Sequence, residues 1–111
     1  KIASVQQPDG LWRASLLDPE EVPVKETSSS TFFTYAMIWG INNGLLSRDI
    51  YMPKVRRAWT ALLECIDENG KLGYVQAIGA SPENVPYTTL FRSGAFLMVA
   101  SEMYKFAERE K

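Results

Sequence analysis

The sequence predicts an all-α protein of about three main helices, in which two buried helices flank an amphipathic one. Residues 26–44 and 94–105 are apolar on nearly every side of a helical wheel, whereas residues 53–66 are apolar on one face only. A helix that is apolar all round must be enclosed by other elements. This order is typical of a helical toroid, where an inner ring of helices lies inside an outer ring. A simple bundle would instead show amphipathic helices throughout.

Length and composition favour a folded piece of chain with no nucleic-acid or membrane partner. The 111 residues suit one small domain or part of a larger one, and 46% hydrophobic residues are enough for a packed core. The net charge of −1 leaves no basic stripe for a phosphate backbone. No stretch approaches the roughly 18 apolar residues that a membrane-spanning helix needs.

The scarcity of cysteine and histidine limits the chemistry. Cys65 is the one cysteine and there is no histidine, so an internal disulfide, a cysteine zinc cluster and Ser-His or Cys-His catalysis within this chain are excluded. Cys65 lies on the apolar flank of the second helix, which predicts a buried structural thiol. No metal or cofactor is expected, and acid–base chemistry would need carboxylates, lysine or tyrosine.

Residues 8–25 form a long connection after a short helical tail at residues 1–7. Pro8, Asp9 and Gly10 are a turn signal, and Trp12 places a large aromatic side chain in the loop. Loops of this length are often functional. Two interpretations stay open: Trp12 belongs to a binding surface, or it packs the loop onto the core together with the neighbouring leucines.

The first buried helix has a polar segment at its start, residues 26–30, with the sequence ETSSS. Any of Thr27 to Ser30 is suited to cap the helix, and Glu26 lies beside the positive end of the helix dipole. Residues 42–44, Asn-Asn-Gly, predict a left-handed stop, with Leu45 placed for the accompanying hydrophobic contact.

The remaining elements follow from shorter signals. Pro53 fits the first turn of the amphipathic helix. Residues 67–70, Asp-Glu-Asn-Gly, predict a turn, so that a short β-hairpin or an extended loop is expected near 67–79. The third helix then begins at about Gly94 and runs to about Lys105.

Eight short motifs occur in order along nearly the whole chain: QPDGLW at 7–12, LDP at 17–19, ETSSS at 26–30, GINNGLL at 40–46, AW at 58–59, GKL at 70–72, VQAIG at 75–79 and GAFL at 94–97. Together they resemble the C-terminal half of unsaturated glucuronyl and rhamnogalacturonyl hydrolases, which form glycoside hydrolase families 88 and 105.

The resemblance implies that residues 1–111 are the C-terminal portion of a single (α/α)6 toroid, a six-hairpin catalytic domain that is incomplete here. Enzymes of these families act on the unsaturated uronic acid that lyases leave at the ends of pectin-type polysaccharides. An aspartate protonates and hydrates the vinyl ether, the sugar rearranges, and the glycosidic bond breaks. This differs from attack at the anomeric carbon.

The implied partners are an oligosaccharide with an unsaturated uronic acid and the missing N-terminal half of the same domain. The family's catalytic aspartate lies in that half, so no catalytic residue is assigned here. Such a piece is expected to be inactive alone. The bacterial cytoplasm and the periplasm are both compatible with such an enzyme.

The resemblance implies a pocket-wall role for five residues. Trp12 is a candidate platform for stacking a sugar, Glu26, Thr27 and Ser28 are candidates for hydrogen bonds to substrate, and Gln76 is expected at the rim. Each has a structural alternative. Glu26 then serves the helix dipole, and the small residues after it cap the helix or let inner helices approach closely.

One segment departs from the family. Residues 86–93, PYTTLFRS, stand where the family has an acidic and aromatic stretch, and they match one reading frame of a widely used sequencing adapter. We expect these residues to be foreign to the natural gene.

Two other functions remain open from the sequence. A helical protein-interaction module would use an apolar groove to bind a partner helix. Another toroid carbohydrate enzyme, such as a lyase, would share the fold without the chemistry.

Overall fold

The computed structural model describes residues 1–13, 15–21, 27–66 and 90–110. It contains a short 3-10 helix, η1 (Ala3–Val5), and three α-helices: α1 (Thr27–Asn42), α2 (Arg48–Glu64) and α3 (Leu90–Arg109). These described ranges hold no β-strand, so the all-α prediction is confirmed for them. The hairpin expected near 67–79 lies outside the described residues.

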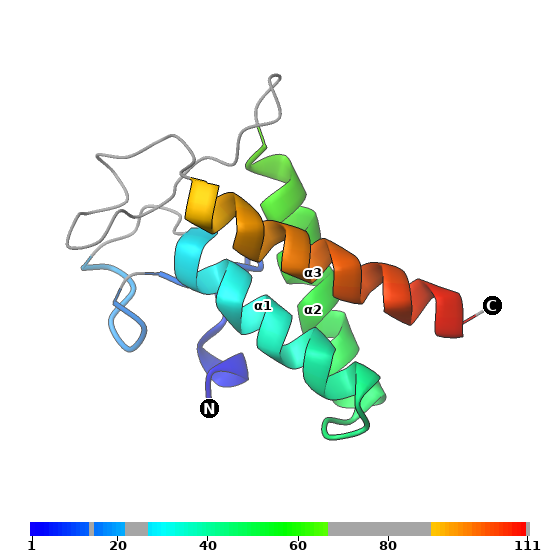
Figure 1. The fold of residues 1–111 in the computed structure, drawn as a ribbon. Coiled ribbons are helices and arrows are strands. Elements are labelled where there is room, and N and C mark those ends of the chain that lie inside the picture. Colours follow the sequence, from blue (N-terminus) through cyan, green and yellow to red (C-terminus); the bar gives the residue numbers. More distant parts are fainter. Residues whose placement is uncertain (14, 22–26, 67–89, 111) are drawn as a thin grey trace.

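The three helices form two layers. Figure 1 shows α1 and α3 side by side and running in the same direction, with their N-terminal ends at one end of the molecule, while α2 crosses behind them and runs back. α1 contacts both other helices. This arrangement confirms the predicted order, in which two largely apolar helices share one layer and the amphipathic helix covers them.

α1 contains no charged residue and buries small hydroxyl side chains against its neighbours. The Thr34 hydroxyl donates to the Ser30 carbonyl at 2.6 Å, and the Thr31 hydroxyl donates to the Thr27 carbonyl in the same way. Because these hydroxyls are satisfied within their own helix, they can be buried without partners elsewhere. The helix begins at Thr27, so Ser28 to Ser30 lie inside its first turn, and the position before Thr27 lies outside the described residues.

The glycine stop of α1 is confirmed in detail. Gly44 has a φ of +72°, the Leu45 amide donates to the Gly40 carbonyl at 2.8 Å, and the Gly44 amide donates to the Ile41 carbonyl at 3.2 Å. These are the two bonds of a Schellman motif. The expected apolar contact of Leu45 is wrong, because Leu45 is exposed and Leu46 instead packs over Gly40.

α2 begins one turn earlier than the sequence indicated. The Ser47 hydroxyl accepts the Ile50 amide at 3.4 Å and caps the helix before Arg48, which leaves Pro53 in the second turn. Its core face buries Val55, Ala58 and Leu62 completely. Cys65, just after the helix, is buried as predicted.

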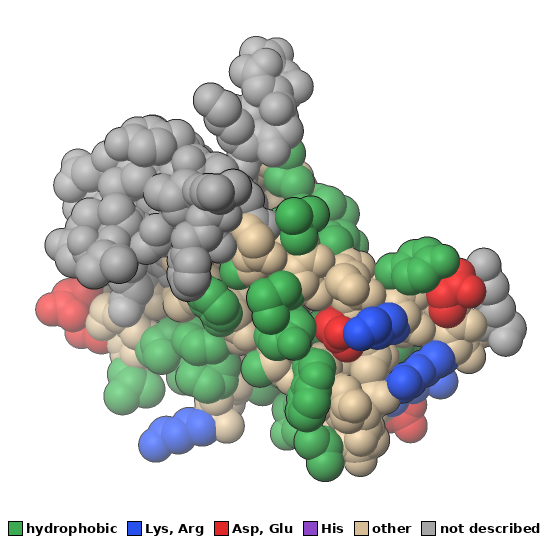
Figure 2. All heavy atoms as spheres, in the orientation of Figure 1, with side chains coloured by type: hydrophobic (Ala, Val, Ile, Leu, Met, Phe, Trp, Pro, Cys, Tyr) green, Lys and Arg blue, Asp and Glu red, His purple; other side chains and the backbone are tan. Residues whose placement is uncertain are grey.

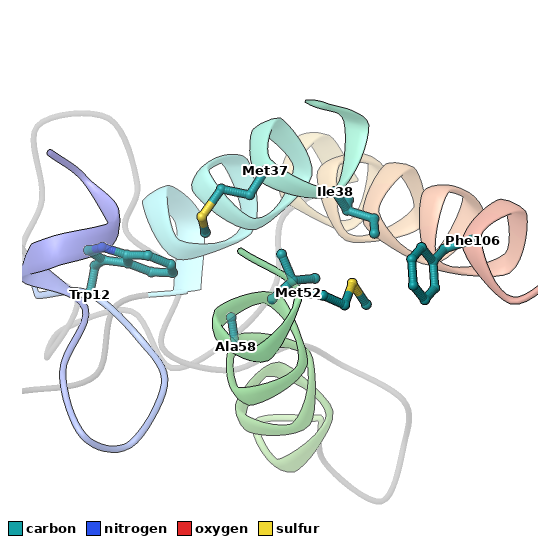
Figure 3. Close-up of a cluster of buried hydrophobic side chains, with 7 residues drawn as sticks. Trp12, Met37, Ile38, Met52, Ala58 and Phe106 are labelled. Carbon is teal, nitrogen blue, oxygen red and sulfur yellow. The ribbon is translucent and has the colours of Figure 1, made fainter. Parts of the chain in front are cut away.

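The core lies between α2 and the layer of α1 and α3. Figure 3 shows side chains from all three helices and from the N-terminal loop meeting there. The cluster consists of Trp12, Met37, Ile38, Met52, Val55, Ala58 and Phe106. The Phe106 ring is flanked by the guanidinium groups of Arg48 and Arg56, at 5.5 and 5.9 Å from its centroid, which ties the end of α3 to α2.

Among the described residues, α2 and the N-terminal loop cover one side of the layer that α1 and α3 form. Figure 2 shows hydrophobic side chains gathered over these two helices on the face turned away from α2. We call this surface the uncovered face; its large exposed side chains are Phe32, Trp39, Leu97, Met98 and Tyr104. This exposure agrees with the expectation that the elements which would enclose these two helices lie outside this chain. None of the described helices has the length and hydropathy to cross a membrane.

Candidate functional site

The candidate site lies where the N-terminal loop, residues 6–13, meets the start of α1. Gly10 sets the path of this loop. Its φ is +96°, and a Cβ atom there would lie 2.5 Å from the Arg57 carbonyl oxygen of α2. The turn closes through a 2.9 Å bond from the Gly10 amide to the Gln7 carbonyl. Only glycine has both the conformation and the space that this approach requires.

Gln6 fastens the same loop to α2. Its amide nitrogen donates to the Gly10 carbonyl at 2.8 Å and to the Lys54 carbonyl at 2.9 Å. Its amide oxygen accepts a bond of 3.1 Å from the Arg57 guanidinium. Sequence reasoning missed Gln6, because its partners in α2 lie about 50 residues away and leave no local pattern.

Trp12 lies inside the core. Its side chain is fully buried, its indole N–H donates to the Ile2 carbonyl at 2.8 Å, and its ring meets Phe33 edge to face at 5.4 Å. A stacking platform needs an open ring face, so this position does not fit the predicted contact with a sugar. It fits the alternative, in which Trp12 packs the loop onto the core.

The polar segment at the start of α1 divides into buried and accessible positions. Thr27 and Ser30 are fully buried, whereas Ser28 and Ser29 are half-buried. The Ser30 hydroxyl accepts the Trp12 backbone amide at 3.0 Å, so it joins the loop to the helix. Of the three predicted site residues within the described ranges, Ser28 is the one whose side chain keeps partial exposure. Glu26 and Gln76 lie outside the described residues.

An ion pair supports the loop beside Trp12. The Arg13 guanidinium lies 2.6 Å from the Asp9 carboxylate, and Asp9 also accepts the Leu11 amide at 3.1 Å. Sequence reasoning did not single out Arg13, although its spacing of four residues from Asp9 was visible. The pair fixes the turn that carries Trp12 toward α1.

A buried carboxyl group, Glu102 of α3, lies at the other end of the molecule, and its pKa departs from the ordinary value. Burial opposes its ionisation, but hydrogen bonds from Asn42 and Lys105 and the charges of Lys105 and Arg109 outweigh burial and lower the pKa. Glu102 is therefore ionised, and it lies at the C-terminal end of α1, far from the polar segment. The described residues also contain no group of three or more histidine, cysteine or acidic side chains suited to a metal.

The chain matches one enzyme family over most of its length. The model of Glycosyl Hydrolase Family 88 covers residues 1–107. The "unsaturated 3S-rhamnoglycuronyl hydrolase" of Formosa agariphila is 50% identical over 110 residues, which are 97% of this chain and 29% of the relative. The chain thus spans about a third of the length of that relative.

Solved structures give the same result. A glycosyl hydrolase family 88 protein from Bacteroides vulgatus superposes with a TM-score of 0.83 at 43% identity, covering 95% of this chain and 32% of that one. A protein described as a polysaccharide lyase superposes with a TM-score of 0.87, also at 43% identity, covering 96% and 32%. With the sequence motifs and the family model in agreement, the chain belongs to glycosyl hydrolase family 88.

Proposed function

We propose that this chain is part of a hydrolase that removes an unsaturated uronic acid from the ends of lyase-cleaved polysaccharides. The observation that carries the proposal is the 50% identity, over nearly the whole chain, to a relative named as an unsaturated rhamnoglycuronyl hydrolase. That name pairs rhamnose with the unsaturated uronate. The proposed substrate is therefore a rhamnose-linked unsaturated oligosaccharide.

The proposed reaction needs an acid and a water molecule. Protonation of the vinyl ether and addition of water give a hydrated sugar, which rearranges and releases the glycosidic bond. In the proposal the proton donor is an aspartate in the part of the longer protein outside this chain. The sequence of this chain holds no histidine, which agrees with a carboxylate as the acid.

In this proposal the described residues build the wall of the pocket. Ser28 is the proposed contact with the sugar, because it is half-buried and lies in the first turn of α1. Trp12, Thr27 and Ser30 are fully buried and support it from behind. Glu26 and Gln76 remain proposed wall residues on the strength of the family motifs alone.

The contribution of Ser28 is measurable in the longer protein that contains this chain. Ser28→Ala is expected to raise KM about two- to tenfold, which is the loss of one neutral hydrogen bond of about 0.5–1.5 kcal/mol. Ser47→Ala, at the cap of α2 away from this end of α1, is the matched control and leaves KM unchanged. Equal kinetics for the two variants would contradict the role of Ser28.

A polysaccharide lyase is the second candidate, and the TM-score of 0.87 to a protein described as one favours it. The two reactions have opposite optical signs. A lyase creates a conjugated double bond and raises ultraviolet absorbance, whereas the proposed hydrolase removes it and lowers the absorbance. Incubating the longer protein with an unsaturated oligosaccharide and, separately, with the intact polysaccharide therefore distinguishes them.

The uncovered face would also suit an interaction module. That function predicts a stable monomeric chain with one groove for a partner helix. The hydrolase proposal predicts instead that the same face is covered within the longer protein. Protection of Trp39 and Tyr104 from a water-soluble quencher or oxidant in the longer protein supports the hydrolase proposal, and full accessibility favours the module.

A further inference from the structure

A buried polar cluster joins α1 and α3 at the end opposite the candidate site. Asn42, in the last turn of α1, and Glu102 of α3 are 6% and 5% exposed. The Asn42 side-chain amide donates to the Glu102 carboxylate at 3.0 Å and to the Glu102 carbonyl at 2.9 Å. The Lys105 ammonium group forms an ion pair with the other carboxylate oxygen at 2.9 Å. The Arg109 guanidinium donates a hydrogen bond to the backbone carbonyl of Asn42. We call this set the Asn42–Glu102 junction.

We propose that the Asn42–Glu102 junction fixes the axial register of α1 against α3, so that Asn42 and Glu102 act as positioning residues for the wall of the candidate site. Contacts between apolar helix faces are not directional, and alternative registers one helical turn apart, about 5.4 Å, present similar surfaces. Hydrogen bonds are directional and are lost within a fraction of that distance.

The burial of the carboxylate makes the register selective. A slip of one turn would separate Glu102 from the Asn42 amide and leave the carboxylate with Lys105 of its own helix as its hydrogen-bond donor. A buried carboxylate oxygen that loses its donor is destabilised. In the observed register both carboxylate oxygens have a donor. The buried hydroxyls of Thr31 and Thr34, by contrast, donate within α1, so these bonds do not depend on the register.

The junction acts on the candidate site through the parallel direction of the two helices. α1 and α3 begin at the same end of the molecule, so an axial shift at the junction displaces their N-terminal ends relative to each other by the same amount. Ser28 and Ser30 lie at that end of α1. This consequence for substrate binding rests on the proposed function, whereas the register itself does not.

The test exchanges the two partners in the longer protein. Asn42→Asp places two carboxylates side by side and removes the donor, and it should raise the unfolding equilibrium constant about ten- to a hundredfold. The double variant Asn42→Asp, Glu102→Gln restores one carboxylate and one amide donor with their positions exchanged, and it should recover most of that loss. A role limited to filling space would give no such rescue.

Register is read from the distance between spin labels at Asn43 and Glu108, two polar, exposed positions near the junction. The parent and the double variant are expected to show one narrow distance, and Asn42→Asp a broadened or displaced one. An unchanged distance in Asn42→Asp, or a double variant that stays displaced, would overturn the proposal. If Asn42→Asp does not fold, the double variant decides alone: the parental distance supports the junction and a different one refutes it.

Activity is measured separately on the same proteins. Asn42→Asp is expected to raise KM for the unsaturated oligosaccharide, and the double variant to restore it. Because the spin-label distance can be measured in an inactive protein, a failure of the register proposal remains distinguishable from a failure of the proposed function.

Discussion

Replacing Gly10 with alanine should destabilise the protein more than replacing any other described glycine. The new Cβ atom would lie 2.5 Å from the Arg57 carbonyl oxygen and 2.7 Å from its carbon, and both are backbone atoms that no side-chain rotation can move. The residue would also keep a φ of +96°. The conformation costs about 1–2 kcal/mol and the forced shift of the loop from α2 about 1–3 kcal/mol, so about 2–5 kcal/mol in all.

Two other glycines separate these contributions. Gly44 has a φ of +72°, and no atom lies within 4 Å of the place that a Cβ atom would take, so Gly44→Ala carries the conformational cost alone, about 1–2 kcal/mol. Gly94 is helical and equally open, and Gly94→Ala should stabilise α3 by about 0.5–1 kcal/mol.

Urea unfolding, followed by tryptophan fluorescence, gives the free energy of unfolding of the parent and of each of the three glycine variants. Measuring at two protein concentrations detects association. The expected order of stability is Gly94→Ala above the parent, then Gly44→Ala, then Gly10→Ala. If Gly10→Ala is no less stable than Gly44→Ala, the N-terminal loop is not packed on the backbone of α2. That result would refute the role of Gly10 in holding the loop at the candidate site.

Four further predictions follow from the same structure. Ser30→Ala removes the buried acceptor of the Trp12 amide and should cost about 1–3 kcal/mol in urea unfolding, which is more than Ser28→Ala at a half-buried position; equal costs would contradict the division of the polar segment. The stability advantage of the parent over Glu102→Gln should be full above the ordinary pKa of 4.5 and shrink as the pH falls through the lowered pKa of Glu102, because the unfolded chain then binds the proton more readily; an advantage that grows in acid would contradict this sign. The isolated 111-residue chain should self-associate through the uncovered face, so light scattering should show an average mass that rises with concentration, and Leu97→Lys with Tyr104→Lys should reduce it. Re-sequencing the source DNA should show that residues 86–93 are absent from the natural gene, and a clean read that encodes them would refute their foreign origin.

The helix types and the end of α1 could be predicted because their signals are local. Residues 42–44 specify the left-handed stop by themselves, and the uncharged sequence of α1 already indicates burial. The first residues of the helices were harder to predict. Pro53 pointed to a later start of α2, but the Ser47 cap prevails because it satisfies a free amide one turn earlier.

The positions that depend on distant partners were not predictable. Trp12 is compatible with a binding surface or a core until the Ile2 carbonyl and the Phe33 ring are placed around it. The bonds of Asn42 to Glu102 join residues that are 60 apart in the sequence. Neither pairing leaves a periodic or compositional trace.

The uncovered face connects the fold to the family result. The chain spans 29% of the Formosa relative and 32% of the solved family member, and within the part that the structure describes α1 and α3 expose large hydrophobic side chains. The expectation that residues 1–111 form part of a larger toroid accounts for both observations.

The central claim is tested most directly by the ultraviolet absorbance of an unsaturated rhamnoglycuronyl oligosaccharide incubated with the longer protein. The account predicts that the absorbance of the conjugated double bond falls as the unsaturated uronic acid is hydrated and released, and that the intact polysaccharide gives no signal. An absorbance that stays constant with the unsaturated oligosaccharide, or one that rises with the intact polysaccharide, would contradict it.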